Sequence, residues 1–367
     1  MARIAIVGSR GIPNAYGGFE WLAEKLAPHL ADAGHQVAVC QSSQHPYREA
    51  SLGKVRLIRS YDPPIGAAGQ FVYDLFSILR VRRWKADVVL LLGYTSSAIW
   101  SFLLPKSALI LQHMDGMEWQ RDKYNKIAKA FLRWSEQMAV RHADVLIADH
   151  PVVRDYLCRK YPMKTVTYIA YGEDESTAEK PVEGLEDEHF DLIMARMEPE
   201  NQVEMLIEGW LAARMTHSLA IAGSLTTGYA RRLVRKYGQY EGIVFLGGVF
   251  DKAKALWLRR HCRYYLHGHK AGGTNPSLIQ VLTHHRRVLV HANVYNLYLA
   301  ECYDLKSFED VHTLAALLQQ EPIQGNEPHL RLEHRWEEVF RRYEGLFGKC
   351  KHGCNPKGKN FVTWKKR

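Results

Sequence analysis

The sequence predicts an α/β protein made of two Rossmann-like, doubly wound parallel-sheet domains that face each other across a cleft. Three observations support this prediction. Short apolar runs alternate with helical patterns, the alternation pauses once and then restarts, and 367 residues are enough for two domains. A cleft between two domains is a favoured place for a ligand.

In the first half of the chain, the apolar runs have the length and composition of buried parallel strands, and helical stretches such as residues 20–33 separate them. Strands are expected at residues 4–7, 37–40, 55–58, 88–92, 108–111 and 145–148. Parallel strands joined by helices connect with a right-handed crossover. Open sheets of this kind bind ligands at the carboxyl ends of their strands, so ligands are expected there.

The alternation stops after Tyr171-Gly172, where an acidic stretch without apolar periodicity is typical of a linker. It restarts with strands expected at residues 190–194, 218–222, 243–246, 264–267 and 287–290. We therefore expect an N-terminal domain over 1–172, a linker over 173–189, a C-terminal domain over 190–335, a final helix over 336–347 and a basic tail over 348–367.

Composition narrows the class of protein. Apolar residues make up 47% of the chain and charged residues 24%, as in folded globular proteins, and the net charge of +10 favours anionic partners. No apolar run reaches the ~18 residues of a membrane span, and the N-terminus lacks the pattern of a signal peptide. A cytoplasmic protein is expected. The basic tail is either a solvated end or an attachment to anionic lipid.

Metal binding is not expected. Cys350 and Cys354, with His352 between them, are too few ligands for a closed zinc site, and no second cysteine pair exists in the sequence. The six cysteines are expected to be free thiols.

A glycine-rich loop follows the first expected strand. Glycines let backbone amides approach a ligand, and free amides at a helix start favour an anion. The spacing Gly8-x-x-Gly11 does not match G-x-G-x-x-G, which disfavours a dehydrogenase. The loop is expected to bind phosphate or an acceptor, or else to serve only the turn. Its candidate residues are Gly11, Tyr16, Gly17, Gly18 and Glu20.

A second glycine-rich loop follows a strand of the second half and precedes a helix expected at 277–282. Such a loop offers backbone and side-chain donors to phosphate or sugar. Its candidate residues are His267, His269, Lys270, Gly272, Gly273, Thr274 and Asn275. Arg196 ends another strand, where it either clamps a diphosphate in a bidentate way or pairs with Glu198 or Glu200.

Together these segments resemble glycosyltransferase family 4, and within it the bacterial rhamnosyltransferases. The similarity extends from the first strand to about Phe347, and it rests on the order and number of modest motifs. These are Gly8-Ser9-Arg10-Gly11-Ile12-Pro13, Tyr16-Gly17-Gly18-Phe19-Glu20, Asp115-Gly116-Met117-Glu118-Trp119 with Arg121 and Lys123, Ala143-Asp144 with Ala148-Asp149, Tyr168-Ile169-Ala170-Tyr171-Gly172, Ala195-Arg196-Met197-Glu198-Pro199-Glu200-Asn201, and His267-Gly268-His269 with Gly272-Gly273-Thr274-Asn275-Pro276-Ser277-Leu278.

The resemblance implies a GT-B fold, a nucleotide-diphosphate sugar as donor, retention of anomeric configuration and no metal ion. It implies that the C-terminal domain holds the donor, that the N-terminal domain holds the acceptor and that the final helix crosses back to the first domain. The best-matching branch is similar to β-1,4-rhamnosyltransferases that use dTDP-L-rhamnose. These act on a lipid-diphosphate-linked saccharide in capsule or cell-wall polysaccharide assembly.

The resemblance adds Asn201 and Gln280 to the expected donor contacts. Gln280 stands where the family usually has a glutamate that binds the nucleotide ribose. Because a neutral hydrogen bond replaces a charge-assisted one, donor binding is expected to be weaker by roughly 1 kcal/mol. Lys270, near the diphosphate, is positioned to compensate for this loss.

The expected catalytic residues are Asp115, His113 and Glu118. Asp115 and His113 follow a strand and should face the cleft, where Arg196, Lys270 and the amides of residues 272–274 stabilise the departing diphosphate. We favour front-face attack over a covalent intermediate, which needs a carboxylate near the anomeric carbon. As alternatives, Asp115 caps its own loop and Glu118 pairs with Arg121.

Residues 119–141 mix basic and aromatic side chains, which indicates either a solvated helix with one face on the core or a surface that meets an anionic membrane. These side chains are Arg121, Lys123, Tyr124, Lys126, Lys129, Phe131, Arg133 and Trp134. No nucleic-acid motif is present. Two other functions stay open: a transferase for a UDP- or GDP-sugar, and a non-catalytic nucleotide-sugar-binding or scaffold protein. The replacement of the usual glutamate by Gln280 is the feature that favours the non-catalytic protein.

Overall fold

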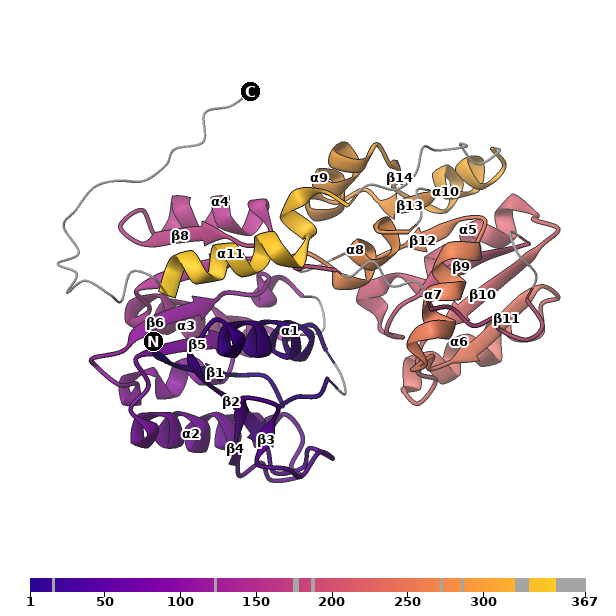
Figure 1. The fold of residues 1–367 in the computed structure, drawn as a ribbon. Coiled ribbons are helices and arrows are strands. Elements are labelled where there is room, and N and C mark those ends of the chain that lie inside the picture. Colours follow the sequence, from indigo (N-terminus) through magenta and orange to yellow (C-terminus); the bar gives the residue numbers. More distant parts are fainter. Residues whose placement is uncertain are drawn as a thin grey trace.

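The computed structural model describes residues 1–14, 17–121, 124–173, 178–185, 189–270, 273–284, 287–320 and 330–347. These residues form two parallel sheets in series, each covered by helices (Figure 1). Neighbouring residues of one strand belong to different cores: Ile4 and Ile6 pack in one cluster, Ala5 and Val7 in another. Both faces of the sheet are therefore buried, which confirms the doubly wound prediction.

The first sheet has eight strands in the order β3-β4-β2-β1-β5-β6-β7-β8. Its strands are β1 (Arg3–Val7), β2 (Gln36–Ser42), β3 (Ser51–Leu52), β4 (Val55–Ser60), β5 (Val88–Leu92), β6 (Leu109–His113), β7 (Val145–Ala148) and β8 (Thr165–Tyr168). All pairs are parallel except β3 with β4. The strand order reverses at β1, which lies between β2 and β5.

The helices around this sheet are α1 (Gly18–Asp32), α2 (Ala67–Trp84), α3 (Lys126–His142) and α4 (Pro151–Lys160), with short 3-10 helices η1 (Ser97–Leu103) and η2 (Glu118–Gln120). On α1, Leu22, Leu26 and Leu30 recur every four residues and are buried against the β1 side chains. This spacing puts them on one face of the helix, so the helix binds the sheet through an apolar stripe.

The second sheet has six parallel strands in the order β11-β10-β9-β12-β13-β14, and its order reverses at β9. Its strands are β9 (Phe190–Met194), β10 (Ser218–Ala222), β11 (Ile243–Gly247), β12 (Tyr265–His267), β13 (Val288–His291) and β14 (Lys306–Phe308). The helices around it are η3 (Pro199–Asn201), α5 (Val203–Ala213), α6 (Gly228–Tyr237), α7 (Lys252–His261), α8 (Pro276–Leu282), α9 (Val294–Tyr303), α10 (Val311–Leu318) and η4 (Leu332–His334).

Every strand expected from the sequence is present, with ends that differ by at most two residues. Three strands were not expected: β3, β8 and β14. Each lies at the edge of its sheet and is only partly buried. Edge strands lack the continuous apolar run that marks a strand buried on both faces, so the sequence signal for them is weak.

The described part of the expected linker packs on the second domain. Lys180 donates its backbone N–H to the carbonyl of Ala253 (3.2 Å), and Val182 and Leu185 join the core beside Phe190. The basic tail, residues 348–367, lies outside the described residues.

The last helix, α11 (Trp336–Phe347), lies along the first domain (Figure 1). The Phe340 ring stacks on His29, with 4.1 Å between centroids, and Arg342 donates to the carbonyl of Tyr168 (3.0 Å). Trp336 packs against Gly172, where a Cβ would lie 2.5 Å from the indole, so only glycine lets the chain pass there. No helix among the described residues is long and apolar enough to cross a membrane.

Candidate functional site

The two sheets meet through the loops at the carboxyl ends of their strands. The loops predicted from the sequence lie where the strand order reverses. In the first sheet this is the loop of residues 8–11 after β1, and in the second sheet these are Arg196 after β9 and residues 268–270 after β12. Open α/β sheets bind ligands outside such reversal points. The first and second glycine loops also approach each other, because a Cβ on Gly18 would lie 3.3 Å from Cγ of Pro276.

Asp149, which follows β7, joins the first domain to the second glycine loop. Thr274 donates its N–H to Oδ2 of Asp149 (3.1 Å) and its hydroxyl to the Asp149 carbonyl (2.6 Å). A Cβ on Gly273 would lie 2.4 Å from the same carboxylate, so the loop reaches Asp149 only because residue 273 is glycine. The Thr274 amide is thus engaged within the protein and is not free for a diphosphate, contrary to the sequence expectation.

A buried ion-pair triad forms a second contact between the domains. Arg121 lies 2.8 Å from Glu118 and 3.0 Å from Glu200 of the second domain, and the three side chains are at most 13% exposed. Burial disfavours the charge on Arg121, but the two carboxylates outweigh burial and raise its pKa. Of the two roles considered for Glu118, the structure therefore supports the pairing with Arg121 and not catalysis.

Asp115 lies in the loop after β6 with φ +53°, a backbone conformation that is uncommon for a residue other than glycine. Its side chain is partly exposed. Burial raises its pKa, while the nearby Arg121 and Arg196 oppose that rise. Asp115 thus stands between a cation of each domain, and strained backbone of this kind is concentrated at functional sites.

His113 does not face the cleft as expected. It is 1% exposed, and its ring lies 5.2 Å from Phe19 and 5.9 Å from Tyr171 between centroids. Burial lowers its pKa to about 3, so the ring is neutral. Its Nδ1 accepts the backbone N–H of Asp115 (3.3 Å). His113 therefore shapes the Asp115 loop instead of contacting a substrate.

The first glycine loop already holds a carboxylate. Glu20 accepts the backbone N–H of Arg10 (2.7 Å), and burial raises the pKa of Glu20. Gly11, at φ +125°, lies against the Gln41 side chain. At the start of α1, Gly17 lies against the Glu20 carboxyl and Gly18 against Pro276, and Tyr16 lies outside the described residues. The loop thus offers fewer free amides than its glycines suggest.

The second loop is braced by polar contacts that leave its cations exposed. Asn201 donates to the carbonyl of Arg196 (2.7 Å) and accepts from His269 (2.7 Å), so it ties the end of β9 to the loop. The Arg196 side chain is 47% exposed, with Glu198 at 3.5 Å and Glu200 at 3.8 Å. Lys270 is exposed, while its N–H donates to the Glu200 carbonyl (3.0 Å). Both cations can therefore turn toward an anion.

The remaining donor candidates differ in their placement. His267 is 5% exposed, burial lowers its pKa to about 3, and its Nε2 has no hydrogen-bond partner among the described residues. Asn275 caps α8 by accepting the Ser277 N–H (2.9 Å). Gly272 lies outside the described residues. Of these three candidates, His267 is the one shown to keep a buried polar atom without a hydrogen-bond partner among the described residues.

Gln280 is engaged inside its own domain. Its Oε1 accepts from the guanidinium of Arg259 (2.8 Å), and burial lowers the pKa of that arginine. A buried cation with a neutral partner is less well compensated than one with a carboxylate. The departure from the family at this position therefore affects the packing of α7 on α8 as well as any contact with a ribose.

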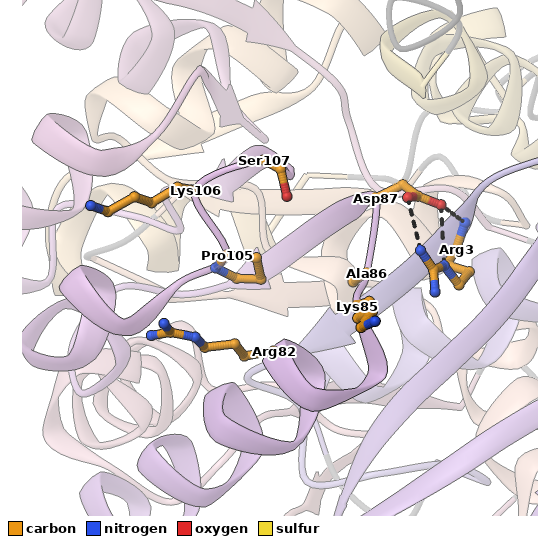
Figure 2. A pocket seen from close by; sticks show the side chains of 8 residues that line it. All are labelled: Arg3, Arg82, Lys85, Ala86, Asp87, Pro105, Lys106 and Ser107. Carbon is orange, nitrogen blue, oxygen red and sulfur yellow. Dashed lines mark hydrogen bonds and ion pairs between the residues drawn. The ribbon is translucent and has the colours of Figure 1, made fainter.

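The structure also shows a hollow far from the glycine loops. It has a volume of about 360 Å³ and is lined by Arg82, Lys85 and Lys106 beside the Arg3–Asp87 pair (Figure 2). Arg3 begins β1 and Asp87 precedes β5, so the hollow lies at the opposite ends of the strands from the cleft. Among the described residues, no group of three His, Cys, Asp or Glu side chains could hold a metal ion.

The chain resembles known proteins in part of its sequence and in its fold. A family model described as a domain of unknown function, DUF1972, matches residues 1–174. No curated protein matches the chain. Among solved structures, sucrose-phosphate synthase from Thermosynechococcus elongatus is similar, with 17% identity and a TM-score of 0.77 over 95% of this chain and 99% of that one. The chain has the GT-B fold.

Two other solved structures are similar over the same extent. HepE from Anabaena, in complex with UDP and glucose, shares 14% identity at a TM-score of 0.69 over 95% of this chain and 99% of that one. A variant of S. aureus TarM, in complex with fondaparinux, alpha-GlcNAc-glycerol and UDP, shares 8% identity at a TM-score of 0.66 over 95% and 100%. At these identities the likeness establishes the GT-B fold.

Asp149 lies at this GT-B interface, although no role was expected for it from the sequence. The available signal was its position directly after a strand of the first sheet, which is the signal that selected Asp115. What the sequence did not reveal is that β7 lies opposite the second glycine loop. That juxtaposition comes from the packing of one domain on the other.

Replacing Arg121 by methionine should lower the free energy of unfolding by about 3 kcal/mol, because Glu118 and Glu200 lose their shared cation while they stay buried. Urea unfolding at pH 7 measures this. As a control, Arg154 forms an exposed pair with Asp155 at 2.7 Å, so Arg154→Met should change stability by less than about 0.5 kcal/mol. Equal effects of the two substitutions would contradict a buried triad.

Proposed function

We propose that the protein is a retaining glycosyltransferase that transfers L-rhamnose from dTDP-L-rhamnose to a lipid-linked saccharide during polysaccharide or glycan assembly. One observation carries the proposal: exposed Arg196 and Lys270 flank a glycine loop at the strand reversal of the second sheet, opposite Asp115 of the first. The solved structures of HepE and TarM contain UDP, which supports a nucleotide ligand for this fold.

The donor diphosphate is bound by cations that the free protein holds loosely. Arg196 lies 3.5 Å from Glu198 and 3.8 Å from Glu200, which are long distances for ion pairs, and Glu200 already pairs with Arg121 at 3.0 Å. A diphosphate offers Arg196 a bidentate contact of higher charge. Lys270 and the amide of Gly273 add to the site. No metal ion is required, because these groups carry the positive charge.

In the reaction, the bond between the anomeric carbon and the diphosphate oxygen breaks, and negative charge builds on the departing diphosphate. Arg196 and Lys270 stabilise that charge in place. The acceptor hydroxyl attacks from the same face, and its proton passes to an oxygen of the leaving diphosphate. Asp115 contacts the sugar or acceptor from the first domain, held in place by the His113 hydrogen bond.

The sugar and nucleotide rest on the resemblance of the motifs to rhamnosyltransferases. The second candidate is a transferase that uses a UDP-sugar, favoured by the UDP in HepE and TarM. A GDP-sugar donor has no such support. A non-catalytic binding or scaffold protein is the alternative of another class, and the pairing of Gln280 with Arg259 is the feature that favours it.

Peripheral contact with the cytoplasmic face of an anionic membrane would bring a lipid-linked acceptor to the cleft. The exposed face of α3 supports this contact, since Ile127 is 82% and Trp134 is 43% exposed beside the basic Lys126, Arg133 and Arg141. The helix begins shortly after the Asp115 loop, near the cleft. Arg121 is buried in the triad and takes no part in this face, and Lys123 lies outside the described residues.

The protein should bind one of dTDP, UDP and GDP, measured by calorimetry without added metal. Arg196→Met should weaken that binding at least tenfold, because the diphosphate loses a charge-assisted contact, and should leave the melting temperature unchanged. Arg235, exposed on α6 away from the strand ends, provides the control variant Arg235→Met. Tightest binding of UDP would replace the dTDP proposal, and binding of none at millimolar concentration would exclude a donor site.

Gln280→Glu should raise the melting temperature, because the buried Arg259 gains a charged partner, and should tighten nucleotide binding about fivefold, or roughly 1 kcal/mol. Gln280→Met, which removes the acceptor at similar size, should lower the melting temperature. If Gln280→Glu raised the melting temperature but left the nucleotide affinity unchanged, residue 280 would act only through its contact with Arg259.

The protein should sediment with vesicles that contain anionic lipid and not with neutral ones, and salt should weaken this binding. Replacing Ile127 and Trp134 together by alanine should reduce the bound fraction several-fold, because the apolar contacts are lost. Phe250 of the second domain is also 82% exposed, so Phe250→Ala is the matched control. Equal losses in both variants would refute a membrane face on α3.

A further inference from the structure

Asp149 is a buried carboxyl at the centre of the domain interface. Asp149 is 1% exposed, and Thr274 donates its hydroxyl to the Asp149 backbone carbonyl (2.6 Å) and its N–H to the carboxyl Oδ2 (3.1 Å). Its next residue, His150, donates Nε2–H to the carbonyl of Tyr295 on α9 (3.2 Å), so two adjacent residues of the first domain hold the second. The end of β7 is therefore the place where the second glycine loop is docked.

The other oxygen of this carboxyl, Oδ1, is buried and has no hydrogen-bond partner among the described residues. A buried, unpaired oxygen is far more costly when it carries charge. The ionisable groups that act on Asp149 from the neighbouring elements are Asp115 after β6, Tyr168 and Tyr171 at β8, Tyr295 on α9 and Tyr343 on α11. No cation is among them in the described part of the chain.

Burial and the neighbouring Asp115 raise the pKa of Asp149 to about 8. Burial also raises the pKa of each of the four tyrosines, so they are uncharged near neutral pH. Asp115 differs from Asp149 because Arg121 and Arg196 act on it and favour its charged form. Burial raises the pKa of both carboxyls, but cations oppose the rise only at Asp115, so Asp149 is the carboxyl of the pair that holds its proton more firmly.

We propose that Asp149 is a positioning residue of the donor site, which as an uncharged carboxyl docks the loop of Gly273 and Thr274 on the first domain. This inference rests on the proposed function, in which the same loop binds a diphosphate. A negative charge on Asp149 would repel that diphosphate and would leave Oδ1 charged without a partner. Binding of the donor is thereby linked to the proton on Asp149, and the affinity falls when this proton is lost.

The test is calorimetry of dTDP, UDP and GDP between pH 7 and pH 9 with the full chain and with Asp149→Asn. The wild-type affinity should fall about tenfold across this range. At the higher pH the free protein has lost the proton of Asp149, so the nucleotide can bind only if Asp149 takes up a proton. Asparagine cannot ionise, and its amide oxygen still accepts from Thr274. The variant should keep an affinity within about threefold of wild type at pH 7 and lose the fall.

Subtracting the pH profile of Asp149→Asn from that of the wild type cancels the titration of every group that both measurements share, including the nucleotide. As a second variant, Asp115→Asn removes the charge that raises the pKa of Asp149, so the fall should begin at lower pH. Equal profiles for wild type and Asp149→Asn, with nucleotide bound by both, would overturn this inference and leave the proposed function intact. Absence of binding to either protein would overturn the proposed function and the inference with it.

Discussion

The contact between Asp149 and Thr274 is the interaction on which the arrangement of the cleft depends. Polar groups buried between two domains lose their water, so each must find a partner in the other domain or stay uncharged. Thr274 supplies two donors to Asp149, and glycine at 273 removes the Cβ that would block the approach. The loop after β12 is thus fixed relative to the first sheet, and Asp115 of the first domain lies near Arg196 of the second.

Charge is divided between the domains in a way that suits an anionic ligand. The second domain exposes Arg196 and Lys270, while Glu200 beside Arg196 is already shared with Arg121. Glu118 and Glu200 share Arg121 in a largely buried triad, so the guanidinium neutralises one of their two negative charges. Arg196 and Lys270 are therefore the exposed cations that a diphosphate would meet, and Asp115 and Glu198 are acidic groups near Arg196.

Several candidates chosen from the sequence serve as supports in the structure. His113 is buried between aromatic rings and orients the Asp115 loop, Glu20 occupies the amide of Arg10, and Asn201 braces the strand end that carries Arg196. Such groups act one step away from a ligand, because they fix the groups that would touch it. Sequence patterns select loops that meet between the two domains, but residue type alone does not separate a supporting group from a contacting one.

The sequence by itself determined the two parallel sheets, their central strands and the two glycine loops, because apolar runs, periodicity and glycine clusters are local properties of the chain. It also placed Arg196, Lys270 and Asp115 at strand ends, where parallel sheets bind ligands. Only the tertiary structure decided that Arg121 pairs across the cleft with Glu200, that Gln280 serves Arg259 and that Asp149 meets Thr274. These pairings join residues 21 to 125 positions apart, and they exist only because packing brings the loops together and burial then forces each polar group to find a partner.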